Sequence, residues 1–208
     1  MNIKKEQTES NGRIPPHIVL LRALKKKEKK EAALHRPITF DRKWAMPNKE
    51  TFRIKPIKEL IEKYVKDGKV WVDPFVRNSI FKPRMTFTND LNTEFLATHH
   101  MDALDFLKTL KDNSCDGVLF DPPYSVRQVA ECYNSVGKKT TMSDTQSTFY
   151  TFLKAEITRI TKKGAVVVSF GWNSGGIGKT LGFCIDEILL VPHGGPHNDT
   201  IVTVEHKL

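Results

Sequence analysis

The stretch CDGVLFDPPYS, residues 115–125, decides how the rest of the chain is interpreted. It opens with a short apolar run that lacks regular polar alternation, which is typical of a strand buried on both faces of a sheet. Asp121 follows directly, and Pro122 and Pro123 then end the strand, because proline has no backbone N–H to donate to a neighbour. The stretch therefore predicts a buried strand with a carboxylate held rigidly at its carboxyl end.

Further apolar runs on both sides of this stretch alternate with turns and with helical patterns. The runs cover 69–72, 85–88, 95–98, 164–170, 183–191 and 200–206, and the helical patterns cover about 102–111 and 148–161. Strands interleaved with helices predict an α/β fold with a doubly wound mixed sheet, here of seven strands. A short loop containing glycine and proline joins the last two runs, so we expect one antiparallel strand at an edge of the sheet.

Basic residues are concentrated in the N-terminal quarter of the 208-residue chain. Residues 1–50 contain 13 Lys or Arg against 6 Asp or Glu, whereas residues 51–208 contain 20 against 18. We divide the chain accordingly into a basic extension over 1–50, partly helical (18–34) or flexible, and a globular domain over 51–208 that begins with a helix at 56–66. The charge predicts an arm that binds nucleic acid, with a solubilising tail as the alternative.

Composition also narrows the class of protein. No apolar run approaches the length of a membrane span, and the N-terminus lacks the apolar core of a secretory signal. Three widely spaced cysteines fit a reducing compartment and form neither a disulfide framework nor a zinc pattern. The histidines at 99, 100, 193 and 197 have no diagnostic metal spacing. We therefore expect a cytoplasmic protein with no membrane partner and no metal, and leave its oligomeric state open.

Several of the predicted strands lead to an aspartate. Asp73, Asp90 and Asp121 follow apolar runs closely, and Asp102 follows the run 95–98 after three residues. Ligands of open α/β sheets bind beyond the carboxyl ends of the strands, so these carboxylates are expected to line one crevice. The alternative for each aspartate taken singly is a turn residue or a helix N-cap.

These segments together resemble S-adenosylmethionine-dependent methyltransferases that modify the N6 amine of adenine in DNA, most of all small orphan enzymes of phages and other mobile elements. The resemblance covers about residues 52–206 and is most specific at DPPY. The other segments that carry it are FRIKPIKEL (52–60), VDPF (72–75), TNDL (88–91), MDA (101–103), FGWNS (170–174) and VPHGGPHNDTIVTVE (191–205). It implies a Rossmann-like methyltransferase fold, with 51–208 as the methyltransferase domain.

The resemblance implies methyl transfer to an adenine that is flipped out of DNA into a pocket made by the DPPY motif. The catalytic residues that it implies are Asp121, Pro122, Pro123 and Tyr124. The exocyclic amine is a poor nucleophile because its lone pair is delocalised into the ring. Asp121 and the Pro122 carbonyl would accept hydrogen bonds from that amine, and Tyr124 would stack on the base.

The resemblance also implies S-adenosylmethionine as cofactor and DNA as partner, with RNA as an alternative. The implied cofactor residues are Asp73, Pro74, Phe75, Asp90, Leu91, Met101, Asp102 and Ala103. Among them, Asp90 is expected to bind the ribose hydroxyls and Asp102 the adenine amine. The basic arm is expected to contact phosphates through Lys25, Lys26, Lys27, Lys29 and Lys30.

Two features keep other interpretations open. The cofactor loop of the family runs Asp-Pro-Phe, a small residue, Gly-Ser-Gly, whereas residues 73–79 read DPFVRNS and lack both glycines. A catalytically weak or inactive nucleic-acid-binding module, or methylation of RNA adenine, is therefore the alternative. Residues 173–180, NSGGIGKT, nearly spell a phosphate-binding P-loop, but a strand-like run follows where a helix is required. We favour a glycine loop over the active site, with Phe170 and Trp172 near the target base.

Overall fold

The computed structural model describes residues 16–34, 37–138 and 147–208, which form two compact units, 1–36 and 37–208. The predicted flexibility of the first residues lies outside the described part. In the first unit, α1 (Pro16–Leu34) confirms the expected helix, and it begins at a proline whose fixed φ suits a first helical turn. No helix in the described ranges is long and apolar enough to cross a membrane.

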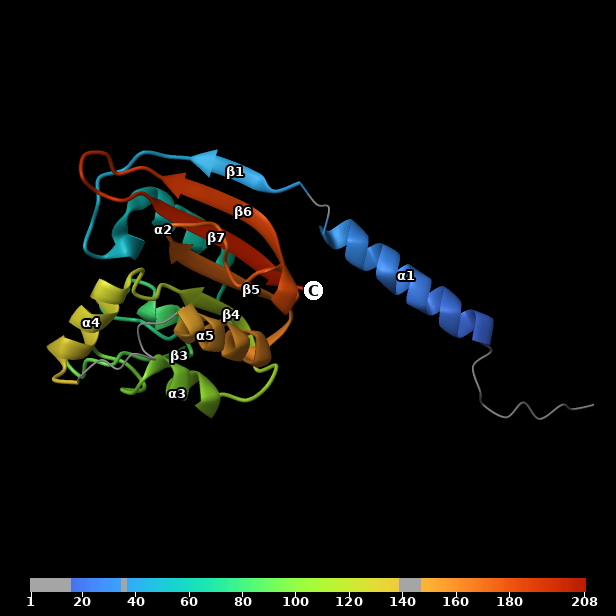
Figure 1. The fold of residues 1–208 in the computed structure, drawn as a ribbon, viewed down its shortest axis with the longest axis horizontal. Coiled ribbons are helices and arrows are strands. Elements are labelled where there is room, and N and C mark those ends of the chain that lie inside the picture. Colours follow the sequence, from blue (N-terminus) through green and yellow to red (C-terminus); the bar gives the residue numbers. More distant parts are fainter. Residues whose placement is uncertain (1–15, 35–36, 139–146) are drawn as a thin grey trace, which may run out of the picture. The chain divides into compact units, whose positions relative to one another are not determined.

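The second unit is built on one mixed seven-stranded sheet, which confirms the predicted doubly wound, Rossmann-like α/β fold (Figure 1). Its strands are β1 (Thr39–Arg42), β2 (Trp71–Asp73), β3 (Phe87–Thr88), β4 (Cys115–Phe120), β5 (Thr161–Gly171), β6 (Phe183–Val191) and β7 (Thr200–Lys207). Their order is β1-β6-β7-β5-β4-β2-β3, and β7 runs antiparallel to both of its neighbours while the other pairs are parallel.

The antiparallel strand is not at an edge, so that part of the prediction is wrong. β7 is inserted between β5 and β6, and Val202 lies opposite Phe170 on one side and Leu189 on the other. Pairing on both sides provides hydrogen-bond partners for the backbone N–H and C=O groups of β7. It also leaves Val202 and Val204 fully buried. The edges of the sheet are formed by β1 and β3 instead.

Two further predictions about strands need correction. Residues 95–98 are not a strand, because Leu96 is 78% exposed and only a single bridge, Asn89 to His99, marks this region. The seventh strand is β1, which lies in a segment that the sequence indicated as a connector. Its residue Phe40 pairs with Ile188 of β6 but is 63% exposed, so no pattern of burial reveals the strand. Residues 37–50, which we placed in the N-terminal extension, therefore belong to the sheet unit.

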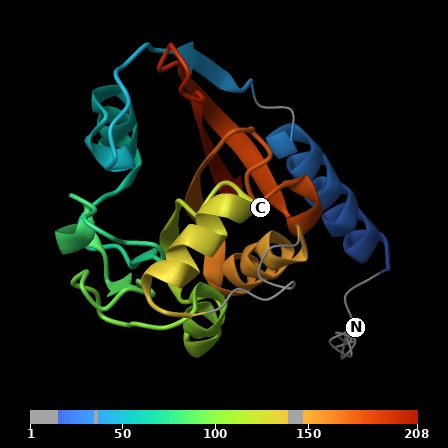
Figure 2. The same ribbon diagram turned by 60° about the vertical axis from the view of Figure 1, so that its left-hand side comes forward.

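Helices cover both faces of the sheet, with α2 on one side and α3 and α5 on the other (Figure 2). The helices are α2 (Lys55–Tyr64), α3 (Ala103–Thr109), α4 (Val126–Ser135) and α5 (Ser147–Ile160), with short 3-10 turns η1 (Thr51–Arg53), η2 (Lys82–Arg84) and η4 (Lys179–Leu181). Leu119 of β4 joins the cluster under α2, whereas its neighbour Val118 joins the cluster under α3 and α5. Burial on both faces explains why the central strands lack an alternation of apolar and polar residues.

We expect Gly117→Ala to destabilise the sheet, because Gly117 of β4 lies opposite Trp71 of β2. A Cβ atom at this glycine would lie 2.5 Å from the buried indole ring. Overpacking of this kind costs about 1–3 kcal/mol of unfolding free energy, measurable by urea denaturation. Gly171→Ala is the matched control, since a Cβ there meets no atom closer than 4.0 Å. Equal stability of the two variants would contradict the packing described.

Candidate functional site

The carboxyl ends of β2, β3 and β4 open on a cleft of about 750 Å³. This is the edge of an α/β sheet where ligands bind. The predicted site residues that line it are Pro74, Phe75, Asp90, Leu91, Met101, Asp102, Ala103, Asp121, Pro122, Pro123 and Tyr124. The structure thus brings together eleven predicted residues from four segments. Asp73 does not line the cleft, because it is completely buried at the end of β2.

The DPPY motif is held in place by hydrogen bonds to α4 and α5. The Tyr124 hydroxyl donates to the Asp121 carboxylate, and the Tyr124 N–H donates to Oε1 of Gln128 at 2.6 Å. The hydroxyl of Tyr150 on α5 donates to the Pro123 carbonyl. No described residue donates to the Pro122 carbonyl, so the motif presents one fixed carbonyl that is free to accept.

Burial raises the pKa of Asp121 to about 6. Hydrogen bonds from Tyr124 and Thr51 and the positive charge of Arg77 oppose this shift. The carboxyl group is therefore mostly ionised at neutral pH. Burial and the Asp121 charge raise the pKa of Tyr124 well above its usual value, so its hydroxyl keeps its proton and remains a donor. Sequence reasoning missed Thr51, which precedes the recognised FRIKPIKEL segment.

Asp73 contributes a buried acceptor without a donor. Its Oδ1 accepts the Phe75 N–H at 3.0 Å, while Oδ2 is buried and has no partner. Burial raises the pKa of Asp73 to about 8; the Phe75 N–H opposes the shift, and the Asp121 and Asp90 charges add to it. A buried carboxylate without enough donors is costly, and the raised pKa means that this carboxyl group keeps its proton at neutral pH.

Asp90 and Asn89 hold the loop that follows β2. The Asp90 carboxylate accepts the Arg77 N–H on Oδ2 and the Asn92 N–H on Oδ1, both at 2.9 Å. The Asn89 amide donates to the carbonyls of Pro74 at 3.2 Å and Met101 at 3.0 Å, and accepts the Met101 N–H at 3.1 Å. Asn89 is a positioning residue that sequence reasoning missed, although it stands inside TNDL.

Asp102 has a structural role at the start of α3. Its Oδ1 accepts the Leu104 N–H at 3.0 Å and so caps α3, as the alternative interpretation proposed. Its Oδ2 accepts from the Tyr133 hydroxyl of α4 at 2.5 Å. The cap leaves the carboxylate on the cleft wall, where lone pairs remain for a ligand. Tyr133 also lines the cleft and was not singled out from the sequence.

Arg77 occupies the position where the resembled family has its first loop glycine. Its φ is +37°, the left-handed region that glycine favours. The hydrogen bond from its N–H to Asp90 holds this conformation, and its guanidinium lies 5.6 Å from the centroid of the Phe95 ring. The loop therefore keeps a glycine-like backbone at this residue without a glycine, and it adds a positive charge to the cleft.

The glycine loop at 173–180 does not bind phosphate through its N–H groups, because N–H groups of this loop donate to a carboxylate of the protein instead. Glu205, fully buried in β7, accepts the N–H of Ile177 at 2.5 Å and of Gly178 at 3.0 Å. A three-residue 3-10 turn, η4, follows in place of a helix, so a P-loop is excluded. A Cβ at Gly176 would lie 2.1 Å from the Glu205 carboxylate, which explains that glycine.

The two aromatic residues expected near the target base have different environments. Trp172 lines the cleft with its ring centroid 5.9 Å from that of Tyr124, as expected. Phe170 is 5% exposed and packs on Phe52 at 4.9 Å, so it is a core residue and that part of the prediction is wrong. Within the described ranges, no group of three or more metal-binding side chains is present.

The lysines of the basic arm lie on α1. Lys25, Lys26 and Lys27 are exposed, and Lys29 and Lys30 belong to the same helix. Because α1 belongs to the first unit, its lysines are a separate feature from the cleft.

Comparison with known proteins returned matches among solved structures alone. No protein-family model and no curated protein matches the chain. TrmN from Thermus thermophilus is 15% identical over 74% of this chain, with a TM-score of 0.48, and this chain spans about half (49%) of its length. A SAM-dependent methyltransferase from Methanosarcina mazei is 11% identical over 72% of this chain and 97% of its own, with a TM-score of 0.48.

A third match is the 1,6-didemethyltoxoflavin-N1-methyltransferase of Burkholderia thailandensis, solved with S-adenosylhomocysteine. It is 10% identical over 95% of this chain and 92% of its own, with a TM-score of 0.48. These similarities are too weak to assign a function, so the functional argument rests on the cleft and its side chains.

Substitutions at Arg77 test the left-handed loop backbone. A side chain in this conformation costs about 1–2 kcal/mol, and glycine avoids that cost but has a more flexible unfolded chain. We expect Arg77→Gly to be more stable than Arg77→Ala by up to about 1 kcal/mol in urea denaturation. The same pair at Asn78, whose φ is not positive, should show the opposite order. If Arg77→Ala were the more stable variant, the left-handed conformation would be contradicted.

The buried Asp73 predicts a loss of stability as pH rises from its unfolded pKa of 3.8 to its folded pKa of about 8. The folded protein holds this proton up to a pH of about 8, whereas the unfolded chain, with a pKa of 3.8, releases it. The free energy of unfolding should therefore fall as pH rises from 6.5 toward 8, by up to about 1.4 kcal/mol per pH unit more in the wild type than in Asp73→Asn. The surface variant Asp105→Asn is the control. Parallel pH profiles for wild type and Asp73→Asn would refute the assignment.

Proposed function

We propose that this protein transfers the methyl group of S-adenosylmethionine to the N6 amine of adenine in DNA. The observation that carries the proposal is the juxtaposition, in one cleft, of the ionised Asp121 carboxylate and the unoccupied Pro122 carbonyl with the rings of Tyr124 and Trp172. Two acceptors and an aromatic wall are what an exocyclic amine on a planar base requires.

The cofactor is proposed to occupy the side of the cleft between β2, β3 and α3. Asp73 is proposed to shape this side from within the protein, since it is completely buried and its Oδ1 holds the Phe75 N–H at 3.0 Å. Asp90 would accept from ribose hydroxyls with its remaining lone pairs, and Asp102 from the adenine amine. The cofactor itself supplies the activated methyl group, while the protein supplies position and electrostatics.

The other residues expected at the cofactor supply the walls of that subsite. Pro74 and Phe75 follow β2, Leu91 follows Asp90, and Met101 and Ala103 flank Asp102 at the start of α3. Asn89 joins the backbone of Pro74 to that of Met101, so two of these walls keep a constant separation. We assign them shape and apolar contact, and the carboxylates polar recognition.

The target adenine is proposed to bind against the DPPY motif. One Asp121 oxygen is occupied by the Tyr124 hydroxyl, so the amine would donate to the other oxygen and to the Pro122 carbonyl. These bonds would localise the lone pair of the amine and stabilise the positive charge that develops on nitrogen. A base within a duplex is out of reach of such a pocket and must be flipped out, and Lys25, Lys26, Lys27, Lys29 and Lys30 of α1 are proposed to hold its phosphates.

Substitutions at Asp121 test this proposal. We expect Asp121→Ala and Asp121→Asn to lower the methyl-transfer rate by about 10²–10³, because each removes a preorganised charge beside the developing ammonium. Tyr124→Phe should lower the rate less. It should also raise the pH at which activity appears, which is about 6 in the wild type, because Asp121 loses a hydrogen bond that lowers its pKa. The measurement is N6-methyladenine in digested DNA by mass spectrometry, with cofactor binding followed by calorimetry.

The surface substitution Asp105→Asn serves as the control and should leave the rate unchanged. Asp105 is an exposed residue of α3 paired with Lys108 at 3.3 Å. Near-wild-type methylation by Asp121→Ala would refute the mechanism. Methylation of RNA but not of DNA would refute the substrate. If the protein binds the cofactor but methylates neither DNA nor RNA, the enzymatic proposal fails and the protein is a nucleic-acid-binding module.

A further inference from the structure

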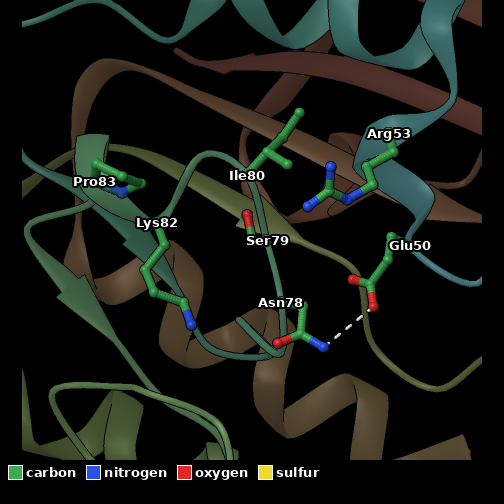
Figure 3. A pocket seen from close by; sticks show the side chains of 7 residues that line it. All are labelled: Glu50, Arg53, Asn78, Ser79, Ile80, Lys82 and Pro83. Carbon is green, nitrogen blue, oxygen red and sulfur yellow. Dashed lines mark hydrogen bonds between the residues drawn. The ribbon is translucent and has the colours of Figure 1, made fainter.

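A second, smaller pocket of about 430 Å³ lies beside the cleft (Figure 3). It is lined by Glu50, Arg53, Asn78, Ser79, Ile80, Lys82 and Pro83. These residues come from the turn around η1 and from the segment that connects the β2 loop to η2. None was expected at the site from the sequence.

The pocket and the cleft are neighbours along two segments of the chain. In the first segment, Lys49 and Thr51 line the cleft, while Glu50 and Arg53 line the pocket. In the second, Arg77 lines the cleft and the adjacent Asn78 lines the pocket. The pocket therefore opens next to the part of the cleft that contains Asp121, since Thr51 hydrogen-bonds to that carboxylate.

Two cations enter this pocket without an ion pair in the described ranges, although the charge of Lys82 lowers the pKa of the buried Asp73. Figure 3 shows the Arg53 guanidinium and the Lys82 ammonium extending into it from opposite sides, with Ser79 and Asn78 between them. Neither cation forms a hydrogen bond or an ion pair through its side chain with any residue in the described ranges. The nearby Arg84, by contrast, is paired with Asp67 at 3.0 Å.

The neutral groups of the pocket are also suited to an anion. Ser79 Oγ accepts the Phe81 N–H at 3.2 Å, which leaves the hydroxyl proton free to donate. Asn78 uses one amide N–H on Glu50 Oε1 at 3.2 Å and keeps the other. Glu50 is the one acidic lining residue and would oppose an anion, but two cations face its single negative charge.

We propose that this pocket binds a backbone phosphate of DNA that flanks the flipped nucleotide. The inference rests on the proposed function for the identity of the polymer. The pocket is lined by no aromatic residue, so it offers no surface on which a base would stack, and a bound group would be held through its phosphate. It lies beside the Asp121 end of the cleft, and a nucleotide extruded against Asp121 keeps a phosphate on each side of its sugar.

The experiment measures binding of a fluorescent mixed-sequence duplex of about 20 base pairs by anisotropy, between about 50 and 200 mM salt. The variants are Arg53→Gln, Lys82→Gln and their combination. Each lost phosphate contact should lower the slope of log affinity against log salt by about 0.9. Arg53 and Lys82 would share one phosphate, so we expect the double variant to lose little more slope than either single variant.

Two further variants sharpen the test. Glu50→Gln removes the opposing charge and should tighten DNA binding. Lys163→Ala is the matched control, because this exposed lysine stands near the amino end of β5, whereas the cleft lies at the carboxyl ends of the strands. This substitution should leave both the DNA affinity and the salt slope unchanged. Loss of slope in Lys163→Ala equal to that in Lys82→Gln would mean a general charge effect and would overturn the proposal.

The outcomes separate the pocket from the proposed function. If the wild type binds DNA and methylates it, but the pocket variants keep its salt slope, the pocket is refuted and the function stands. If the variants lose slope while the wild type transfers no methyl group, the pocket stands and the enzymatic proposal fails. Titration with inorganic phosphate supplies the last arm: phosphate binding that the pocket variants abolish, with an unchanged DNA slope, would assign the pocket to a free anion and refute the DNA contact.

Discussion

The parallel pairing of β2 with β3 on one side and with β4 on the other is the constraint on which the rest of the site depends. Val72 and Asp73 pair with Phe87 and Thr88, and Val72 also pairs with Val118. Because all three strands point the same way, the residues that follow them emerge at one edge of the sheet. Helices cover both faces of the sheet and exclude water from the strand ends, and this burial raises the pKa of Asp73 and of Asp121.

The loop after β2 shows how one interaction can compensate for the absence of glycines. In the resembled family, glycine provides the left-handed backbone there; in this chain Arg77 adopts it, with the Asp90 carboxylate accepting its N–H. The left-handed conformation is unfavourable for Arg77, and the hydrogen bond from its N–H to the buried Asp90 carboxylate offsets that cost. Asp90 thereby acts as a positioning residue for the loop as well as a ligand candidate, and its two roles use different lone pairs of the same carboxylate.

Two carboxyl groups at the ends of neighbouring strands differ in charge: Asp73 is completely buried, whereas Asp121 lines the cleft. Burial raises the pKa of Asp73 to about 8, so this group is largely protonated in the free protein at neutral pH, whereas Asp121, with a pKa of about 6, is largely ionised. Donors already present around Asp121 account for the difference, since Tyr124 and Thr51 both hydrogen-bond to it.

Local sequence determined the α/β class, most strands and the placement of carboxylates at strand ends, because hydrophobic runs and prolines act within a few residues. It also determined four helices, at 16–34, 55–64, 103–109 and 147–160. Tertiary structure decided what depends on long-range pairing. The short, exposed β1 is a strand only because β6 lies beside it, and β7 is central only because β5 and β6 both accept it. Likewise the glycines before Lys179 resemble a phosphate loop in sequence, but Glu205, distant along the chain, accepts the N–H groups of Ile177 and Gly178. Asn89 and the pocket around Arg53 and Lys82 join segments far apart in sequence, so only the fold could reveal them.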